Sequence, residues 1–294
     1  MMLTPDVFYI GYQKAASAFL RGFFTQHHQV YWDRKAYSYV INPTSVEHSD
    51  GERAEIEQAK VYISMSEALC KSLILNDCAI WPEIAFRKIN WRDFTNMIAI
   101  NPLGIAERMK HNCPDARVLM IIRNQVDWLK SNYIHFMGNL ELKKRRFEDF
   151  CETTEGMVVL QAGMYDTTIE TYFNVFGENN VKVLLFERLS TDYRGLMGEL
   201  CDFLGIDFVE YDNVIVNKGK SLSHWLILRF LPFSSPLPVP ELISTKIKKT
   251  LNRFPLRKEA IFSKEVRSLI RSYYAISNMR ASHLLRCDLT QYGY

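Results

Sequence analysis

The stretch FYIGYQKAASAFLRGFF, residues 8–24, decides the fold of this chain. It opens with apolar residues typical of a buried strand and closes with apolar residues at helical spacing. Between them lies a short loop that holds one lysine, Lys14, followed by small residues. Backbone N–H groups at a helix start have no partner inside the helix, so small side chains and a nearby lysine make an anion site. The stretch therefore predicts a strand–loop–helix unit that binds an anion.

Four short segments read as buried strands, at residues 7–11, 60–64, 116–122 and 181–186. Each is a continuous run of aliphatic and β-branched residues, which is typical of parallel strands buried on both faces. Helical patterns fill the intervals, at residues 17–27, 103–112, 125–137, 157–176, 194–204 and 264–286. This alternation predicts an α/β fold over a single domain, 1–294, with a central parallel sheet flanked by helices.

Charged or polar residues follow each predicted strand. They are Lys14, the pair Ser66 and Glu67, Arg123, and the pair Glu187 and Arg188. Because ligands in such sheets bind at the carboxyl ends of strands, we expect these residues to crowd one edge of the sheet.

The first loop lacks the Walker pattern GxxxxGK[ST], because only Gly11 precedes Lys14 and the next glycine is Gly22. An ATP-hydrolysing P-loop enzyme is therefore disfavoured. Ser17 can add a hydroxyl or cap the helix. Taken alone, the stretch is explained equally well by a surface lysine before a capped helix.

A second strand–turn–helix pattern, RVLMIIRNQVDWLKSNYIHF, covers residues 117–136. Arg123 stands at the strand end, and Ser131 lies eight residues later on the following helix. Arginine can grip a phosphate through two parallel hydrogen bonds, and serine adds a donor. Together with the first loop, this pattern predicts two anion sites on one sheet edge.

The two segments resemble the cofactor motifs of sulfotransferases that depend on PAPS, 3′-phosphoadenosine 5′-phosphosulfate. The first family motif reads Lys-x-Gly-Thr-Thr-x-Leu and is matched by residues 14–20. The second has an arginine and a serine eight residues apart, matched by Arg123 and Ser131. The resemblance extends over residues 106–124, 181–206 and 288–294, and thus over most of the chain.

The resemblance implies a P-loop NTPase-like three-layer fold and transfer of a sulfuryl group without a metal. The product of the donor is then 3′,5′-adenosine bisphosphate. Arg123 and Ser131 are expected to hold the 3′-phosphate. The residues expected to hold the 5′-phosphosulfate are Lys14, Ala15, Ala16, Ser17 and Ala18. Two departures from the motif matter here: Ala16 replaces a frequent glycine, where a positive φ would cost about 1 kcal/mol or more, and Ala18 replaces a frequent threonine.

The same resemblance suggests roles in catalysis. Lys14 is expected to stabilise the leaving phosphate, and a base should take the acceptor's proton. Relatives often carry a Lys-Glu pair after the first helix, but Lys35 or Ala36 stands where that glutamate would fall. Glu67 is our candidate for the base, with Asp33 and His135 as alternatives.

Two late segments also carry expectations. In the family, a basic stretch after the later helix can fold over the 3′-phosphate, so Lys218, Gly219 and Lys220 are candidates for a lid and for cofactor binding; a solvated turn is an equally good reading. A Pro-rich, partly helical insertion is expected at about 222–260.

The acceptor is expected to be a hydroxyl or amine of a glycan, a lipid or a small molecule. Aromatic residues that suit a sugar face, a lipid or a phenol enrich the segments expected to line its pocket. They are Tyr31, Trp32, Tyr37, Tyr39, Trp81, Phe86 and Trp91. Two alternatives remain open: a kinase-like P-loop enzyme, and a catalytically silent PAPS-binding homologue.

Bulk properties limit partners and compartment. The net charge of +3, from 36 basic and 33 acidic residues, is too small to indicate nucleic-acid binding. The six cysteines have no zinc-like or CxxC spacing, which favours free thiols in a reducing compartment. No signal peptide is recognised, and the apolar segment 225–243 carries Arg229 and four prolines, which makes it a poor membrane span. We therefore expect a cytoplasmic protein, with peripheral contact to a membrane left open.

Overall fold

The structure is a computed structural model that describes residues 3–12, 14–36, 39, 44, 46–66, 102–137, 147–152, 154–211 and 261–294. Several expectations fall outside these residues. They are the candidate base Glu67, the lid residues Lys218, Gly219 and Lys220, the insertion at about 222–260, and the aromatic residues Tyr37, Trp81, Phe86 and Trp91.

Five strands form one sheet in which every pair is parallel, in the order β2-β3-β1-β4-β5. The strands are β1 (Val7–Ile10), β2 (Val30–Asp33), β3 (Val61–Ser66), β4 (Arg117–Ile122) and β5 (Val181–Leu185). The central parallel sheet is thus confirmed, and four strands lie within two residues of their predicted bounds. The strand β2 was not predicted, because it has only four residues, three of them half-buried.

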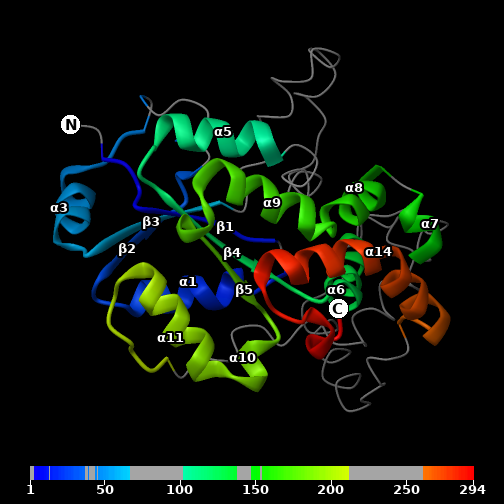
Figure 1. Cartoon of the computed structure of the whole chain (residues 1–294). Coiled ribbons are helices and arrows are strands. Elements are labelled where there is room, and N and C mark those ends of the chain that lie inside the picture. The colour runs from blue at the N-terminus through cyan, green and yellow to red at the C-terminus, as the bar shows by residue number, and fades with distance from the viewer. Residues whose placement is uncertain are drawn as a thin grey trace, which may run out of the picture.

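Helices cover both faces of the sheet (Figure 1). The helices α5 (Pro102–Asn112) and α9 (Tyr165–Phe176) lie on one side, and α1 (Ser17–Gln26) and α11 (Tyr193–Leu204) lie on the other. The central strand divides its side chains between two cores. Val7 and Tyr9 pack with residues of α1 and α11, whereas Phe8 and Ile10 pack with residues of α5 and α9. This three-layer arrangement explains why the strands are apolar throughout.

Further helices gather near the carboxyl ends of the strands (Figure 1). They are α6 (Gln125–Met137), α8 (Thr154–Ala162), α14 (Lys264–Leu285) and the 3₁₀ turn η6 (Leu289–Tyr292). The remaining elements are α3 (Asp50–Gln58), α7 (Phe147–Cys151), η4 (Glu178–Asn180) and α10 (Arg188–Thr191). The helix α3 was also not predicted, although Ser49 and Glu52 form a reciprocal capping box at its start.

The single helix predicted over 157–176 is wrong, because the chain breaks there into α8 and α9. Tyr274 of α14 causes the break: its hydroxyl donates to the carbonyl of Leu160 at 2.7 Å, and a Cβ at Gly163 would lie 2.7 Å from its oxygen. Glycine at 163 therefore lets a buried tyrosine from a distant helix enter between the two segments.

Candidate active site

The loop after β1 holds two non-glycine residues in the left-handed conformation. Lys14 has φ 69° and Ala16 has φ 62°. Each costs about 1–2 kcal/mol, a strain that persists only where the surroundings fix it. Where left-handed residues alternate with residues of another backbone conformation, successive backbone N–H groups can point into one concavity. Such a concavity suits an anion. The positive φ considered for Ala16 is therefore confirmed, whereas the binding of an anion by this loop stays a prediction.

A tyrosine behind the loop fixes its shape. The hydroxyl of Tyr9, in β1, donates to the carbonyl of Ala15 at 3.3 Å, and Ala15 is fully buried. A Cβ at Gly11 would lie 2.1 Å from the Tyr9 oxygen, so this contact requires glycine at position 11. The single glycine of the loop thus serves to seat Tyr9.

The helix after the loop begins without a side-chain cap. Ala16 is the capping residue of α1, and Ser17 is the first helical residue, so the expectation that Ser17 caps the helix is wrong. Ser17 and Ala18 are both half-buried at the helix start. Their contact with a cofactor stays a prediction.

Arg123, the residue of the second predicted anion site, contacts the loop after β1. Nη1 of Arg123, directly after β4, donates to the carbonyl of Lys14 at 2.9 Å. The Arg123 guanidinium also lies over the ring of Phe186, with its Cζ 4.3 Å from the ring centroid. Nε of Arg123 is buried without a hydrogen-bond partner, and burial lowers the pKa of this side chain. Within the described residues the guanidinium forms no ion pair, so it keeps capacity for an anion.

Asn124 organises the start of the following helix. Its side-chain oxygen accepts from the backbone N–H groups of Val126 at 3.0 Å and Asp127 at 3.4 Å, which caps α6. Ser131 lies on this helix and is half-buried. His135 lies on the same helix, but its side chain is outside the described part of the structure.

The residues after β5 divide between two roles. Glu187 accepts from the backbone N–H of Asn124 at 2.8 Å and from the Tyr294 hydroxyl at 3.0 Å, and burial raises the pKa of Glu187. Arg188 instead forms ion pairs with Asp192 at 2.6 Å and Glu199 at 2.7 Å. The expectation of one crowded edge thus holds for Glu187, whereas Arg188 fastens α10 to α11.

Two tyrosine contacts near Arg123 were not predicted from the sequence, although the resemblance covers residues 288–294. Tyr294 contacts Glu187 only because the fold brings the two together. Tyr165 of α9 likewise donates its hydroxyl to the carbonyl of Arg123 at 2.7 Å. Asn124 could have been found, because asparagine between a predicted strand and a predicted helix is a preferred cap.

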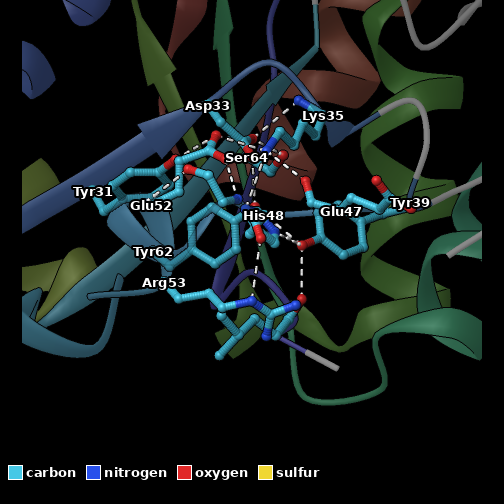
Figure 2. A network of polar contacts seen from close by, with 12 residues as sticks. Tyr31, Asp33, Lys35, Tyr39, Glu47, His48, Glu52, Arg53, Tyr62 and Ser64 are labelled. Carbon is cyan, nitrogen blue, oxygen red and sulfur yellow. Dashed lines mark hydrogen bonds and ion pairs between the residues drawn. The ribbon is translucent and has the colours of Figure 1, made fainter. Parts of the chain in front are cut away.

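A separate polar network joins the end of β2 to residues inside β3 (Figure 2). The buried Asp33 carboxylate accepts from the Tyr62 hydroxyl at 2.6 Å, the Ser64 hydroxyl at 2.5 Å and the backbone N–H of Lys35 at 3.0 Å. Three donors occupy the carboxylate, so Asp33 holds two strands and the following turn together. This bonding favours a structural role over its alternative role as the base.

The hydrogen bonds of His48 fix its protonation. Tyr39 donates to the carbonyl of Leu3 at 2.7 Å, so Nε2 of His48 must donate to the Tyr39 oxygen, at 2.8 Å. Nδ1 then accepts from Nζ of Lys35 at 3.1 Å, and the same Nζ pairs with Glu52 at 2.7 Å. Burial, and then the charge of Lys35, lower the pKa of His48. The imidazole is therefore neutral.

The aromatic residues expected near the acceptor lie apart where the structure describes them. Tyr31 and Tyr39 belong to the network of Figure 2, with Tyr31 donating to Glu52 at 3.4 Å. Trp32 instead packs against the core that contains α1 and donates to the Thr25 hydroxyl at 3.0 Å. These three residues therefore do not line one common surface.

Three further features concern metal binding, membrane crossing and the cysteines of the described residues. Among the described residues, no group of three His, Cys, Asp or Glu side chains could hold a metal ion. The helices that the structure describes include none that is long and apolar enough to cross a bilayer. The described cysteines are free; Cys113 and Cys201 are buried, and Cys151 and Cys287 are half-buried.

Comparisons with known proteins agree on one family. A family model described as the sulfotransferase domain matches residues 4–223. Sulfotransferase 2A6 of Mus musculus is 27% identical over 127 residues, which are 39% of this chain and 43% of that protein. The chain thus spans less than half the length of this curated relative.

Comparison with solved structures shows the fold. The sulfotransferase from Alicyclobacillus acidocaldarius is 18% identical, with a TM-score of 0.57 over 99% of this chain and all of the other. It shares the fold, which confirms the P-loop NTPase-like architecture. Mouse sulfotransferase SULT7A1, solved with PAP, is 13% identical with a TM-score of 0.45 over 98% of this chain and 88% of the other.

Proposed function

The chain belongs to the sulfotransferase domain family, and from that premise we propose that it transfers a sulfuryl group from PAPS to a hydroxyl or amine of an acceptor. The observation that carries this proposal is the contact between the two anion motifs. Arg123 donates to the carbonyl of Lys14, so residues 109 positions apart in the sequence form one site. A ligand with an anionic group at each end matches such a site.

The residues present fit the donor. The 5′-phosphosulfate is assigned to the lysine and backbone of the strained loop at Lys14 and Ala16, together with Ser17 and Ala18 at the helix start. Ala15 belongs to the same loop, but its own N–H donates to the carbonyl of Tyr12 at 3.0 Å. The buried, unpartnered Nε of Arg123 supplies a donor for the 3′-phosphate, and Ser131 adds a hydroxyl. ATP and ADP lack a 3′-phosphate, so this second site favours PAPS over a kinase substrate. Mouse SULT7A1 was solved with PAP, which is consistent with this choice.

The protein has to stabilise the leaving group and remove one proton from the acceptor. PAPS supplies an activated sulfuryl group joined to its 5′-phosphate. Lys14 stabilises the negative charge that develops on the phosphate oxygen as the bond from that oxygen to sulfur breaks. The acceptor's oxygen or nitrogen forms the new bond to sulfur, and the acceptor's proton passes to a base.

We propose Glu67 as that base. It comes directly after β3 in the sequence, and β3 pairs with β1, the strand that precedes Lys14. Asp33 is the weaker alternative because its carboxylate is occupied by three donors. His135, on the same helix as Ser131, is a third.

The remaining parts of the proposal concern the surroundings of the site. Lys218, Gly219 and Lys220 form a lid over the 3′-phosphate, and the chain 1–294 is one catalytic domain with its insertion at about 222–260. The acceptor is a glycan, a lipid or a small molecule. Free thiols among the described cysteines are consistent with a cytoplasmic enzyme.

The test compares two nucleotides that differ only in the 3′-phosphate. Calorimetry should give 3′,5′-adenosine bisphosphate about 30- to 1000-fold higher affinity than 5′-AMP, for one bidentate charged contact and one hydroxyl bond. Arg123→Ala should remove most of this preference, and Ser131→Ala a smaller part. Equal affinity in the wild type would overturn the proposal and return a kinase-like enzyme to consideration.

A catalytically silent PAPS-binding protein is the second candidate, because Ala16 is strained and Ala18 offers no hydroxyl. Incubation with labelled PAPS and an acceptor mixture separates the two. Transfer of label supports the enzyme, and binding without transfer supports the silent protein. Mass spectrometry of products from a host extract, searching for a gain of one sulfate, would identify the acceptor.

A further inference from the structure

The segment Asp288–Tyr294 reaches the second anion loop and binds a carboxylate there. We propose that Tyr294 is a positioning residue of the 3′-phosphate site: its hydroxyl holds the Glu187 carboxylate away from Arg123 and leaves the guanidinium to the ligand. The inference rests on the proposed function, because it takes Arg123 as the group that binds the phosphate.

Glu187 and Arg123 are neighbours across the ends of β4 and β5. The Arg123 guanidinium lies over Phe186, the residue before Glu187. The Glu187 carboxylate in turn accepts from the N–H of Asn124, the residue after Arg123. Each charge favours the ionised form of the other. Opposite charges attract strongly in a partly dehydrated site, yet these two described side chains form no ion pair.

Both oxygens of Glu187 are occupied by other donors. Oε1 accepts from the backbone of Asn124 at 2.8 Å, and Oε2 accepts from the Tyr294 hydroxyl at 3.0 Å. The first donor belongs to the main chain and is fixed by the capped start of α6. The second donor comes from a side chain. Tyr294 is therefore the part of this arrangement that a single substitution can remove.

The position of Tyr294 is itself well fixed. The carbonyl of Gly293 accepts from Nδ2 of Asn124, and Gly293 has φ 80°, which favours glycine. Leu289 is fully buried and its N–H bonds to the Ser282 hydroxyl at 3.2 Å. The Tyr294 ring lies 6.3 Å from the ring of Tyr165. The hydroxyl is thus delivered to Glu187 by a segment anchored on several elements.

Removing this hydroxyl has a specific consequence. Oε2 of Glu187 loses its donor, and Arg123 is the neighbouring cation across the strand ends. A carboxylate that pairs with Arg123 competes with a phosphate for the same guanidinium. The damage comes from the charge of Glu187, so neutralising that charge should repair the site even though the tyrosine hydroxyl is still missing.

Calorimetry with 3′,5′-adenosine bisphosphate and 5′-AMP tests this. Tyr294→Phe should reduce the preference for the bisphosphate by on the order of 10-fold, as expected for a charged competitor at the site, and leave 5′-AMP binding unchanged. The double variant Tyr294→Phe, Glu187→Gln should return to within about twofold of the wild-type preference. Tyr292→Phe removes a hydroxyl from the same segment that forms no hydrogen bond within the described residues, and should change nothing. Thermal melts establish that each variant is folded.

If Tyr294 only stabilises the fold, the affinities of these variants should follow a different pattern. If the double variant binds the bisphosphate as weakly as Tyr294→Phe does, or if Tyr294→Phe keeps the full preference, the positioning role is wrong while the proposed function stands. Equal wild-type affinity for the two nucleotides would overturn the proposed function and the positioning role with it.

Discussion

The sheet has two sides, one at β2 and β3 and one at β1 and β4, that differ in how completely their polar groups are bonded. On the side of β2 and β3, Asp33 accepts three hydrogen bonds and the Lys35 ammonium contacts Glu52 and His48 (Figure 2). On the side of β1 and β4, the backbone is left-handed at Lys14 and Ala16, and Nε of Arg123 is buried without a partner.

This difference distinguishes a region that holds the fold together from a region suited to binding a ligand. A buried polar group without a partner costs about 1–3 kcal/mol, and so does each strained residue, so such features persist where a ligand later uses them. A network with its bonds complete gains nothing from a ligand and serves to hold the fold. Substitutions of charged residues on the side of β1 and β4 should therefore affect kcat or ligand affinity, whereas substitutions in the network of β2 and β3 should affect stability.

The largest effect is expected at the first loop. Lys14→Ala should lower kcat by roughly 100- to 1000-fold, because a preorganised charge at the leaving oxygen acts mainly in the transition state. The matched control is Lys35→Ala on the other side, which should keep kcat within a few-fold and lower the melting temperature instead. Near-normal turnover in a folded Lys14→Ala protein would remove Lys14 from catalysis.

The next effect concerns the base. Glu67→Gln should lower kcat roughly 100-fold while the affinity for 3′,5′-adenosine bisphosphate stays within a few-fold. Steady-state kinetics with the identified acceptor, together with calorimetry, measure the two quantities. Retained activity would move attention to Asp33 and then to His135.

Asp33→Asn should affect stability rather than rate. The new amide nitrogen cannot accept from Tyr62 or Ser64, so unfolding should become easier by about 1–3 kcal/mol. Urea denaturation measures this loss, and kcat of the folded fraction should change by less than about threefold. A 100-fold loss of kcat in a folded Asp33→Asn protein would make Asp33 the base and erase the distinction drawn between the two sides.

Acidification should weaken the same network by a smaller amount, since protonated His48 loses only its contact with Lys35. The folded-state pKa of His48 lies below its ordinary value of 6.5, so the unfolded chain takes up the proton first. Its contribution to stability is therefore present above pH 6.5 and is lost as pH falls. Urea denaturation at pH 7.5, 6.5 and 5.5 should show a steeper loss in the wild type than in His48→Gln. Equal slopes would contradict the neutral imidazole.

The smallest effect tests the strain in the first loop. Ala16→Gly should stabilise the protein by up to about 1 kcal/mol, because relief of the left-handed strain exceeds the entropy that glycine adds to the unfolded chain. The same change at Ala18, inside α1, should destabilise by about 0.5–1 kcal/mol. If both variants lose stability equally, the loop is not strained in solution.

Local signals carried most of what the sequence could predict. The units β1–α1 and β4–α6 each combine a buried strand, a short loop and an apolar helix, so the sequence predicts that Lys14 and Arg123 lie just after strand ends, which the structure confirms. The break at Gly163 and the contact of Tyr294 with Glu187 could not be found this way. In both cases a tyrosine arrives from a segment more than 100 residues away in the sequence, and side-chain packing between distant segments leaves no periodic pattern.

The hydrogen bond from Arg123 to the Lys14 carbonyl joins the two loops, so we expect ligand binding at one loop to be thermodynamically coupled to binding at the other. A ligand that spans them binds as a chelate, so the free energies contributed by its two ends should not add independently. If a fragment occupying one loop changes the affinity of the other loop for a second fragment, the second must change the affinity for the first by the same factor. Measuring adenosine 3′-phosphate and inorganic sulfate alone and together would give that coupling free energy directly.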